Sequence, residues 1–240
     1  MRARAGYAFT ELVVTLALSA VVAAALGSVL LTHLRVARII AARTSAADAT
    51  RLALHVLATE FRLASPAADI HASGRDSIAA RLPRLSGTVC ALGPGRIWVR
   101  ASGMREPDPS KDSVLLVSGV GERATALAGL TEEAGPCPPA SGQTVYRLDW
   151  TPAPERGGAV LVFENGSYFL RERALRLRMG GEGRQPLTEE VFLDAGSGFV
   201  LRSDSGQAGL EVRLLAAKVF GEALALPVRS VIRFPNVLRQ

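Results

Sequence analysis

The architecture is decided by the first 35 residues, MRARAGYAFTELVVTLALSAVVAAALGSVLLTHLR. Residues 12–31 form a run of 20 without a single ionisable group. At a rise of about 1.5 Å per residue, a helix of this length spans about 30 Å, the thickness of the hydrocarbon core of a bilayer. The sequence therefore predicts one membrane-spanning helix. Arginines flank it on both sides, so the positive-inside rule does not settle its orientation.

Two ordinary kinds of N-terminal segment fit this run. A secretory signal peptide would carry small residues such as Ala23, Ala24 and Ala25 before its cleavage site. The run is longer than the usual apolar core of about 7–15 residues, and the acidic Glu11 weakens the basic start that such signals use. A retained signal anchor is the second kind, with Glu11 at the membrane interface.

A third interpretation rests on the stretch Gly6-Tyr7-Ala8-Phe9-Thr10-Glu11-Leu12-Val13-Val14, which resembles the prepilin N-terminal cleavage and methylation motif of type IV pilins. In that family a prepilin peptidase cuts after the glycine and N-methylates the new terminus. The resemblance implies cleavage after Gly6 and methylation of Tyr7. The chain departs from the motif at Tyr7 and Ala8, where Phe and Thr are commoner, and its apolar helix has no proline.

The resemblance also supplies a role for Glu11. A lone carboxylate inside a bilayer costs about 2.5–3.5 kcal/mol on insertion scales, so it favours a partner. Cleavage creates one, because the amine of Tyr7 on one subunit can pair with Glu11 of a neighbour when their helices pack with an axial offset. An interfacial carboxylate that faces headgroups is the alternative. The residues expected to carry the helix packing are Leu12, Val13, Val14, Leu16 and Leu18.

The helix is expected to continue beyond the membrane. Residues 33–63 contain neither Gly nor Pro and are rich in Ala, Leu and Arg. The segment ends at Ser65-Pro66, because the residue before a proline resists the helical region. We therefore predict one helix over residues 9–63. The face expected to pack on a sheet is formed by Leu52, Val56, Thr59 and Leu63.

The rest of the chain predicts antiparallel β-structure, and hence an α+β, pilin-like fold with a β-rich head on a long helix. Leu210-Glu211-Val212-Arg213-Leu214 alternates as a strand with one buried face does. The strongest hairpin signal is Asn165-Gly166, a pair that favours a two-residue type I′ turn. Strands are predicted at 88–92, 96–101, 113–117, 144–151, 158–164, 167–173, 190–193, 199–203, 210–216 and 228–234, with loops at 103–110 and 135–142.

Four segments follow from these predictions. They are a leader peptide over residues 1–6, a transmembrane and filament-core helix over 7–34, a helical spine over 35–64 and a β-rich head over 65–240.

Cys90 and Cys137 are the only cysteines. In an exported domain we expect them to form one disulfide, with two unrelated buried thiols as the alternative. Without neighbouring histidines they make a weak zinc site, and we expect no metal or cofactor.

The sequence carries no recognisable catalytic arrangement, so we predict a structural protein rather than an enzyme. His33, His55 and His71 include no metal-binding pair at i and i+4. Gly196-Ser197-Gly198 lacks the full nucleophile-elbow pattern. The net charge of +6 comes almost entirely from arginine, and no basic run is interleaved with aromatic residues, so nucleic-acid binding is not expected.

Residues 49–64, ATRLALHVLATEFRLA, resemble the corresponding stretch of the minor pseudopilin J of type II secretion and of W-type minor pilins. Val145-Tyr146-Arg147-Leu148 and Ser167-Tyr168-Phe169-Leu170-Arg171 resemble strand pairs of that group. The resemblance implies a subunit at or near a filament tip, anchored in the inner membrane with a periplasmic head. Its partners would be other minor and major pilins or pseudopilins, the prepilin peptidase and the inner-membrane assembly platform.

Two alternatives remain at this point. One is a membrane-anchored, extracytoplasmic ligand-binding β-rich domain that joins no filament, for which Gly6 and Glu11 would be dispensable. The other is a minor pilin of a DNA-uptake (competence) machine.

Overall fold

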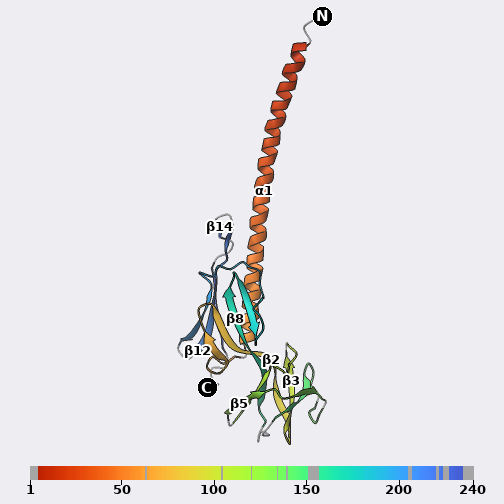
Figure 1. Ribbon diagram of the computed structural model, residues 1–240, viewed down its shortest axis with the longest axis vertical. Coiled ribbons are helices and arrows are strands. Elements are labelled where there is room, and N and C mark those ends of the chain that lie inside the picture. Colours follow the sequence, from red (N-terminus) through yellow and green to blue (C-terminus); the bar gives the residue numbers. More distant parts are fainter. Residues whose placement is uncertain are drawn as a thin grey trace.

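The chain folds into one long helix and a β-rich head, which confirms the predicted α+β class (Figure 1). The computed structural model describes residues 5–62, 64–103, 105–119, 121–133, 135–138, 140–150, 157–204, 207–219, 222–223 and 227–234. Helix α1 (Ala5–Phe61) has 57 residues, which confirms a single unbroken helix. Leu63, its predicted last residue, and residues 1–4 of the predicted leader lie outside the described residues.

After α1 comes a short helix, α2 (Pro66–Asp69), and then a series of antiparallel strands. The strands are β1 (Ile70–Ser73), β2 (Ser77–Gly93), β3 (Arg96–Gly103), β4 (Ser113–Ser118), β5 (Gly121–Ala126), β6 (Leu130–Glu132), β7 (Thr144–Asp149), β8 (Ala159–Arg171), β9 (Ala174–Met179), β10 (Gln185–Pro186), β11 (Gly198–Asp204), β12 (Gln207–Leu214), β13 (Lys218–Val219), β14 (Glu222–Ala223) and β15 (Val228–Arg233).

Two long central strands, β2 and β8, organise the head. They pair with each other from Ser77↔Phe169 to Thr88↔Ala159 in a large sheet of order β10-β9-β8-β2-β3-β7-β6. Strand β1 adds to the start of β2, and β4, with β5 beside it, adds to the start of β8. A separate three-stranded sheet has the order β11-β12-β15.

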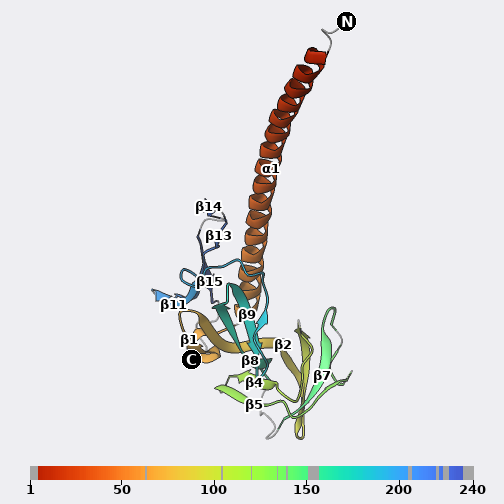
Figure 2. The ribbon, with the colours of Figure 1, turned by 45° about the horizontal axis from the view of Figure 1, so that its top comes forward.

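The two long strands run through two lobes with separate cores (Figure 2). The upper lobe, next to α1, buries residues of the helix, the beginning of β2, the end of β8, β9 and the three-stranded sheet. The lower lobe buries residues of β3, β4 and β7 with the end of β2 and the beginning of β8, around Trp150. The backbone of β2 and β8 therefore connects the lobes covalently and by hydrogen bonds.

The packing face of α1 differs from the predicted one. Leu52 is exposed, Val56 and Thr59 are half-buried, and the face that meets the sheets is rotated from that stripe. Small side chains allow the helix backbone to approach the sheet closely, so much of the buried face consists of alanines, whereas the prediction chose mainly larger aliphatic residues. The buried face consists of Ala46, Ala49, Ala53, Leu57 and Phe61.

The predicted Asn165-Gly166 hairpin is wrong, because β8 runs straight through both residues. Asn165 pairs with Arg81 and Gly166 with Ala80 on the neighbouring β2. A Cβ on Gly166 would overlap the Leu82 side chain, so the glycine serves a close approach between strands rather than a turn.

The real hairpin joins β8 to β9 through Glu172 and Arg173. Their φ angles are 51° and 63°, as a type I′ turn requires, although neither residue is glycine or asparagine.

Most other strand predictions are confirmed, with bounds that differ by three residues or fewer at 96–101, 113–117, 144–151, 199–203, 210–216 and 228–234. Thr151 lies outside the described residues. Residues 190–193 form no strand and contribute only the isolated bridge Phe192↔Ala216. The beginning of β2 and strands β1, β5, β6, β9, β10, β13 and β14 were not predicted.

Candidate functional site

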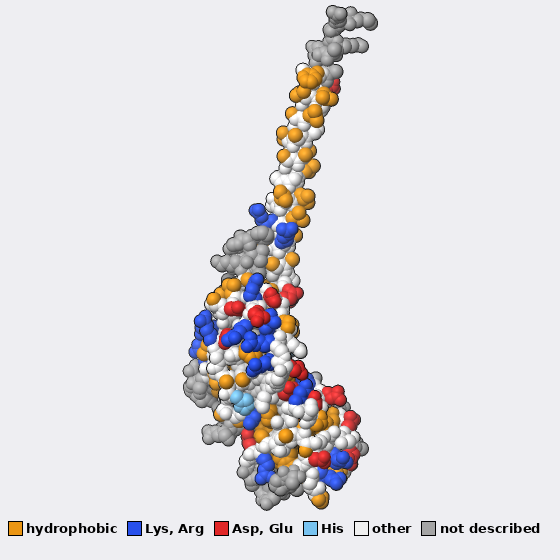
Figure 3. All heavy atoms as spheres, viewed as in Figure 1, with side chains coloured by type: hydrophobic (Ala, Val, Ile, Leu, Met, Phe, Trp, Pro, Cys, Tyr) orange, Lys and Arg blue, Asp and Glu red, His pale blue; other side chains and the backbone are white. Residues whose placement is uncertain are grey.

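The N-terminal half of α1 stands free of the head, and hydrophobic side chains cover much of the face seen in Figure 3. Exposed aliphatic residues at successive positions extend this apolar surface around the helix. Its aliphatic side chains from Leu12 to Leu34 are about half exposed or more, and none of its most apolar 18-residue window is buried. A helix that is hydrophobic all round belongs in a membrane or in the core of a larger assembly. By length and composition, this helix can cross a membrane.

The hydroxyl groups inside the apolar run are satisfied by the helix itself. Thr15 donates to the Leu12 carbonyl at 2.9 Å, and Ser19 donates to the Thr15 carbonyl at 2.7 Å. Ser28 and Thr32 donate in the same way to carbonyls three and four residues earlier. Because these groups need no water, they can lie in hydrocarbon. Glu11 is the ionisable side chain that directly precedes the run.

The predicted cleavage, methylation and assembly residues lie close together near the start of α1. Tyr7 and Glu11 are four residues apart in α1, about one helical turn. Gly6 precedes them within the helix, whose described part begins at Ala5. The predicted packing residues are all exposed: Leu12, Val13, Val14, Leu16 and Leu18. Cleavage, methylation and assembly themselves stay predictions.

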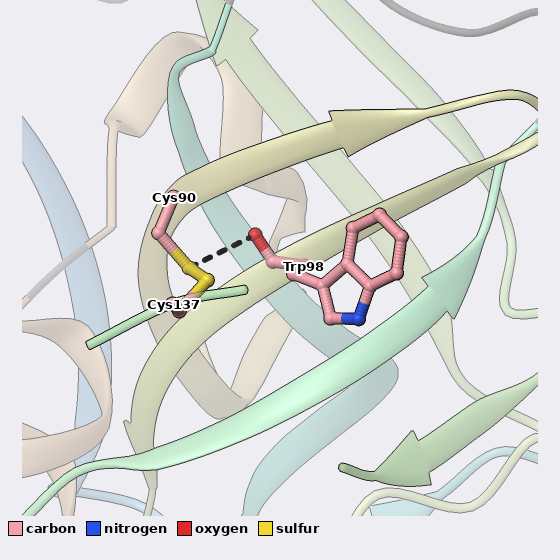
Figure 4. Close-up of a disulfide and its surroundings, with 3 residues drawn as sticks. All are labelled: Cys90, Trp98 and Cys137. Atoms are coloured by element: carbon pink, nitrogen blue, oxygen red, sulfur yellow. Dashed lines mark hydrogen bonds between the residues drawn. A yellow bond between two sulfur atoms is a disulfide. The ribbon is translucent and has the colours of Figure 1, made fainter. Parts of the chain in front are cut away.

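The expected disulfide is formed between Cys90 and Cys137 (Figure 4). Their Cα atoms are 5.7 Å apart, an ordinary separation. Cys90 lies at an irregularity in the pairing of β2 with β3, and its Sγ is 3.3 Å from the Trp98 carbonyl oxygen. Gly135 has a φ of 42° and passes so close to the Trp98 ring that a Cβ would overlap it. The disulfide thus fastens the segment before β7 to the edge of the lower lobe.

Two buried ion-pair clusters hold the segment between β3 and β4 against the rest of the head. Arg84, at an irregularity between β2 and β8, places its Nε 2.7 Å from Asp112 Oδ1 and also contacts Glu164. Arg105 pairs with Glu60 in the last turn of α1. Burial raises the pKa of both Glu60 and Asp112 despite their arginine partners. The lower lobe is therefore tied to the helix end by charged groups as well as by strands.

Sequence reasoning missed these clusters, because their members are up to 80 residues apart in the chain. The residue that could have indicated a buried ion pair is Glu60, an acidic residue beside Phe61 on the buried side of the helix.

The described residues contain no group of three or more His, Cys, Asp or Glu side chains placed to hold a metal ion. His33, His55 and His71 are exposed and lie along α1 and on β1. A hollow of about 630 Å³ next to the Arg105 segment is lined by Pro107, Pro109, Tyr146 and other residues that form no catalytic arrangement. That the protein is not an enzyme stays a prediction.

Comparisons with protein-family models, curated proteins and solved structures give no match to this chain.

Proposed function

We propose that the chain is a minor pilin or pseudopilin of a type IV filament-like machine, which primes assembly at or near the filament tip. The observation that carries the proposal is the continuity of α1, whose free apolar half and buried half form one unbroken helix. A simple membrane anchor needs only a span and a flexible linker. A helix that continues without a break into the core of the head transmits the position of its free half to the head.

The mechanism follows from the chemistry of the free half. Apolar side chains on every face let α1 exchange lipid contacts for contacts with the helices of neighbouring subunits. Because the hydroxyl groups of the run are satisfied internally, Glu11 is the group that requires a partner. Cleavage after Gly6 would provide one in the amine of Tyr7 on another subunit. Pairing between subunits then sets the axial offset between helices, and the head remains on the outer side of the inner membrane.

The proposal is tested first by the N-terminus. The full chain is expressed with and without a prepilin peptidase, extracted from membranes, and analysed by intact mass and N-terminal sequencing. We expect a peptidase-dependent terminus at N-methyl-Tyr7, and the variant Gly6→Leu should remain uncleaved. Retention of Met1 would indicate a signal anchor, and a start beyond Ala25 would indicate a secreted domain. Either of these outcomes would remove the basis for a filament subunit.

A second experiment separates processing from assembly. Glu11→Gln keeps the size of the side chain but removes its charge, so we expect normal cleavage and loss of the subunit from sheared filaments. Thr15→Val, one turn later, is the matched control, because Thr15 donates only to its own helix. Equal incorporation of the Glu11→Gln and Thr15→Val variants would contradict the pairing role.

A further inference from the structure

The outer face of the three-stranded sheet carries an unusual arrangement of charges. In β12, Leu210, Val212 and Leu214 point into the core of the upper lobe, so Glu211 and Arg213 point outward. Val200 of β11 and Val231 of β15 are the register partners of Glu211 on either side, and both are exposed. We call the outward residues Val200, Arg202, Glu211, Arg213, Arg229 and Val231 the arginine face.

Three arginines converge on Glu211 at the centre of this face. Arg229 Nη2 donates to Glu211 Oε2 at 2.8 Å, Arg213 Nε donates to Glu211 Oε1 at 2.5 Å, and Arg202 Nε donates to Oε2. The Glu211 side chain has no solvent-exposed surface, whereas those of Arg202, Arg213 and Arg229 are 37%, 49% and 60% exposed. The carboxylate therefore lies beneath a layer of guanidinium groups.

These hydrogen bonds, with that from Arg229 the strongest, lower the pKa of Glu211 to about 2, so the carboxylate stays charged at any physiological pH. Three positive groups against one negative group leave an excess of positive charge. A guanidinium has five N–H donors, and each arginine uses one of them on Glu211 in the contacts described. The remaining donors belong to side chains whose positions Glu211 already restrains. Such pre-positioned guanidinium forks bind carboxylates in the bidentate way that Arg favours.

The surroundings of the face decide between possible anionic partners. The head first buries α1 at Ala46, 15 residues beyond Leu31, which is about 22 Å of helix past the apolar run. Figure 1 shows β12 on the flank of the upper lobe, well away from the free end of α1. The face is thus poorly placed for lipid headgroups. Nucleic acid is disfavoured because Val200 and Val231 flank the central carboxylate and a phosphate backbone offers them no apolar contact.

Arginine beside exposed aliphatic side chains is instead the composition of a protein interface. We propose that the arginine face binds an acidic segment of a partner protein, whose carboxylates accept hydrogen bonds from Arg202, Arg213 and Arg229 and whose apolar side chains cover Val200 and Val231. The inference does not depend on the filament role.

The test uses the full chain in nanodiscs of zwitterionic phosphatidylcholine. A fluorescein-labelled peptide of alternating Glu and Val is titrated with the protein and followed by fluorescence polarisation, beside a peptide of alternating Gln and Val. We expect saturable binding of the Glu peptide at least tenfold tighter than that of the Gln peptide. The affinity should fall as the salt concentration rises.

Variants locate the site. Arg213→Ala with Arg229→Ala should weaken binding of the Glu peptide at least tenfold, while Arg202 still pairs with Glu211. Arg96→Ala with Arg123→Ala removes the same charge from exposed positions on the lower lobe and should change the affinity less than twofold. Arg213→Lys with Arg229→Lys keeps the charge but loses the planar fork, and should weaken binding at least fivefold. Circular dichroism checks that each variant is folded.

Several outcomes would overturn the proposal. Equal binding of the two peptides would remove the carboxylate requirement, and equal losses in the two alanine double variants would reduce the effect to net charge. Full affinity in the lysine double variant would exclude a geometric site. Tighter, Arg213- and Arg229-dependent binding of a 20-nucleotide single-stranded DNA, or of vesicles that contain phosphatidylglycerol, would reassign the face to nucleic acid or to lipid.

Discussion

The two halves of α1 are built from similar apolar residues but have opposite surroundings. In the free half, large aliphatic side chains point in all directions and remain exposed. In the buried half, the contact face begins with three alanines and only then turns to Leu57 and Phe61. The comparison shows that the apolar content of a helix does not determine which of its faces packs against the rest of the protein. A free half can use bulky residues because its neighbours can adjust, whereas the buried half must fit between two sheets that the same chain supplies.

The largest expected difference in stability is between alanine variants of two phenylalanines at opposite ends of the helix. Phe61 is 1% exposed and lies between Tyr168 and Phe234, with ring centroids 6.0 and 6.4 Å away. Phe61→Ala leaves a cavity there and should lower the free energy of unfolding of the head by about 3–5 kcal/mol. Phe9 is 68% exposed, so Phe9→Ala should leave that free energy unchanged within about 0.5 kcal/mol.

Urea unfolding of both full-length variants in nonionic detergent, followed by circular dichroism, makes this measurement. A destabilisation by Phe9→Ala as large as that by Phe61→Ala would show that the free half packs on the head in solution.

A smaller effect should follow from enlarging an alanine in each half. Ala53 is fully buried at the helix–sheet contact, so Ala53→Leu must displace neighbours and should destabilise the head by about 1–3 kcal/mol. Ala24 is exposed, and Ala24→Leu should have no effect on the head. The same urea titration compares the two. If Ala53→Leu leaves the free energy of unfolding unchanged, the helix is loosely packed against the sheet around Ala53, and their close approach is unimportant for stability.

The features of this fold that depend on local sequence were predictable. The length of α1 follows from its apolar run and from residues 33–63, which contain neither Gly nor Pro, and the outward position of Glu211 follows from strict alternation in β12. The buried side of the helix was not predictable, because it depends on which sheet residues face it. For the same reason the ion pairs of Arg84 and of Glu60 could not be foreseen, since their partners come from distant segments.

The turns of the sheet also could not be predicted from local sequence alone. Asn165-Gly166 has the ideal turn composition but lies within β8, because β2, β4 and β9 pair along nearly the whole length of that strand. Glu172 and Arg173 form the turn against their own backbone preference, because the strands on either side continue to pair up to Arg171↔Ala174. Tertiary pairing thus overrides local propensity at both places.

This conflict predicts a modest gain in stability. Arg173→Gly removes the strain of a positive φ. The Arg173 N–H donates to Asp194 and the Arg173 carbonyl accepts from the Phe192 N–H, and neither hydrogen bond depends on the side chain. The free energy of unfolding should rise by about 0.5–1 kcal/mol. Arg123→Gly, in the extended and exposed β5, is the control and should lower it by a similar amount. Equal losses from both changes would mean that the turn is not strained.

The smallest effect at neutral pH concerns the two glutamates of α1, Glu11 and Glu60. Among the residues that the structure describes, none forms an ion pair with Glu11, whereas Glu60 is buried and paired with Arg105. Burial outweighs that pairing and raises the pKa of Glu60 above its usual 4.5, so the folded state binds a proton more readily than the unfolded state. The contribution of Glu60 to stability is therefore fully present below pH 4.5 and is lost as the pH rises through the folded-state pKa.

Glu60→Gln keeps an acceptor for Arg105 and carries no charge at any pH. We expect a change within about 1 kcal/mol at pH 7, with the variant gaining relative to the native chain as the pH rises from 4 to 7. Unfolding by urea at both pH values measures this difference, and Glu11→Gln serves as the control because it should show none. The opposite trend, with glutamine losing stability toward pH 7, would show that the Arg105 pairing outweighs burial and that the ion pair, rather than the surrounding apolar contacts, ties the helix end to the lower lobe.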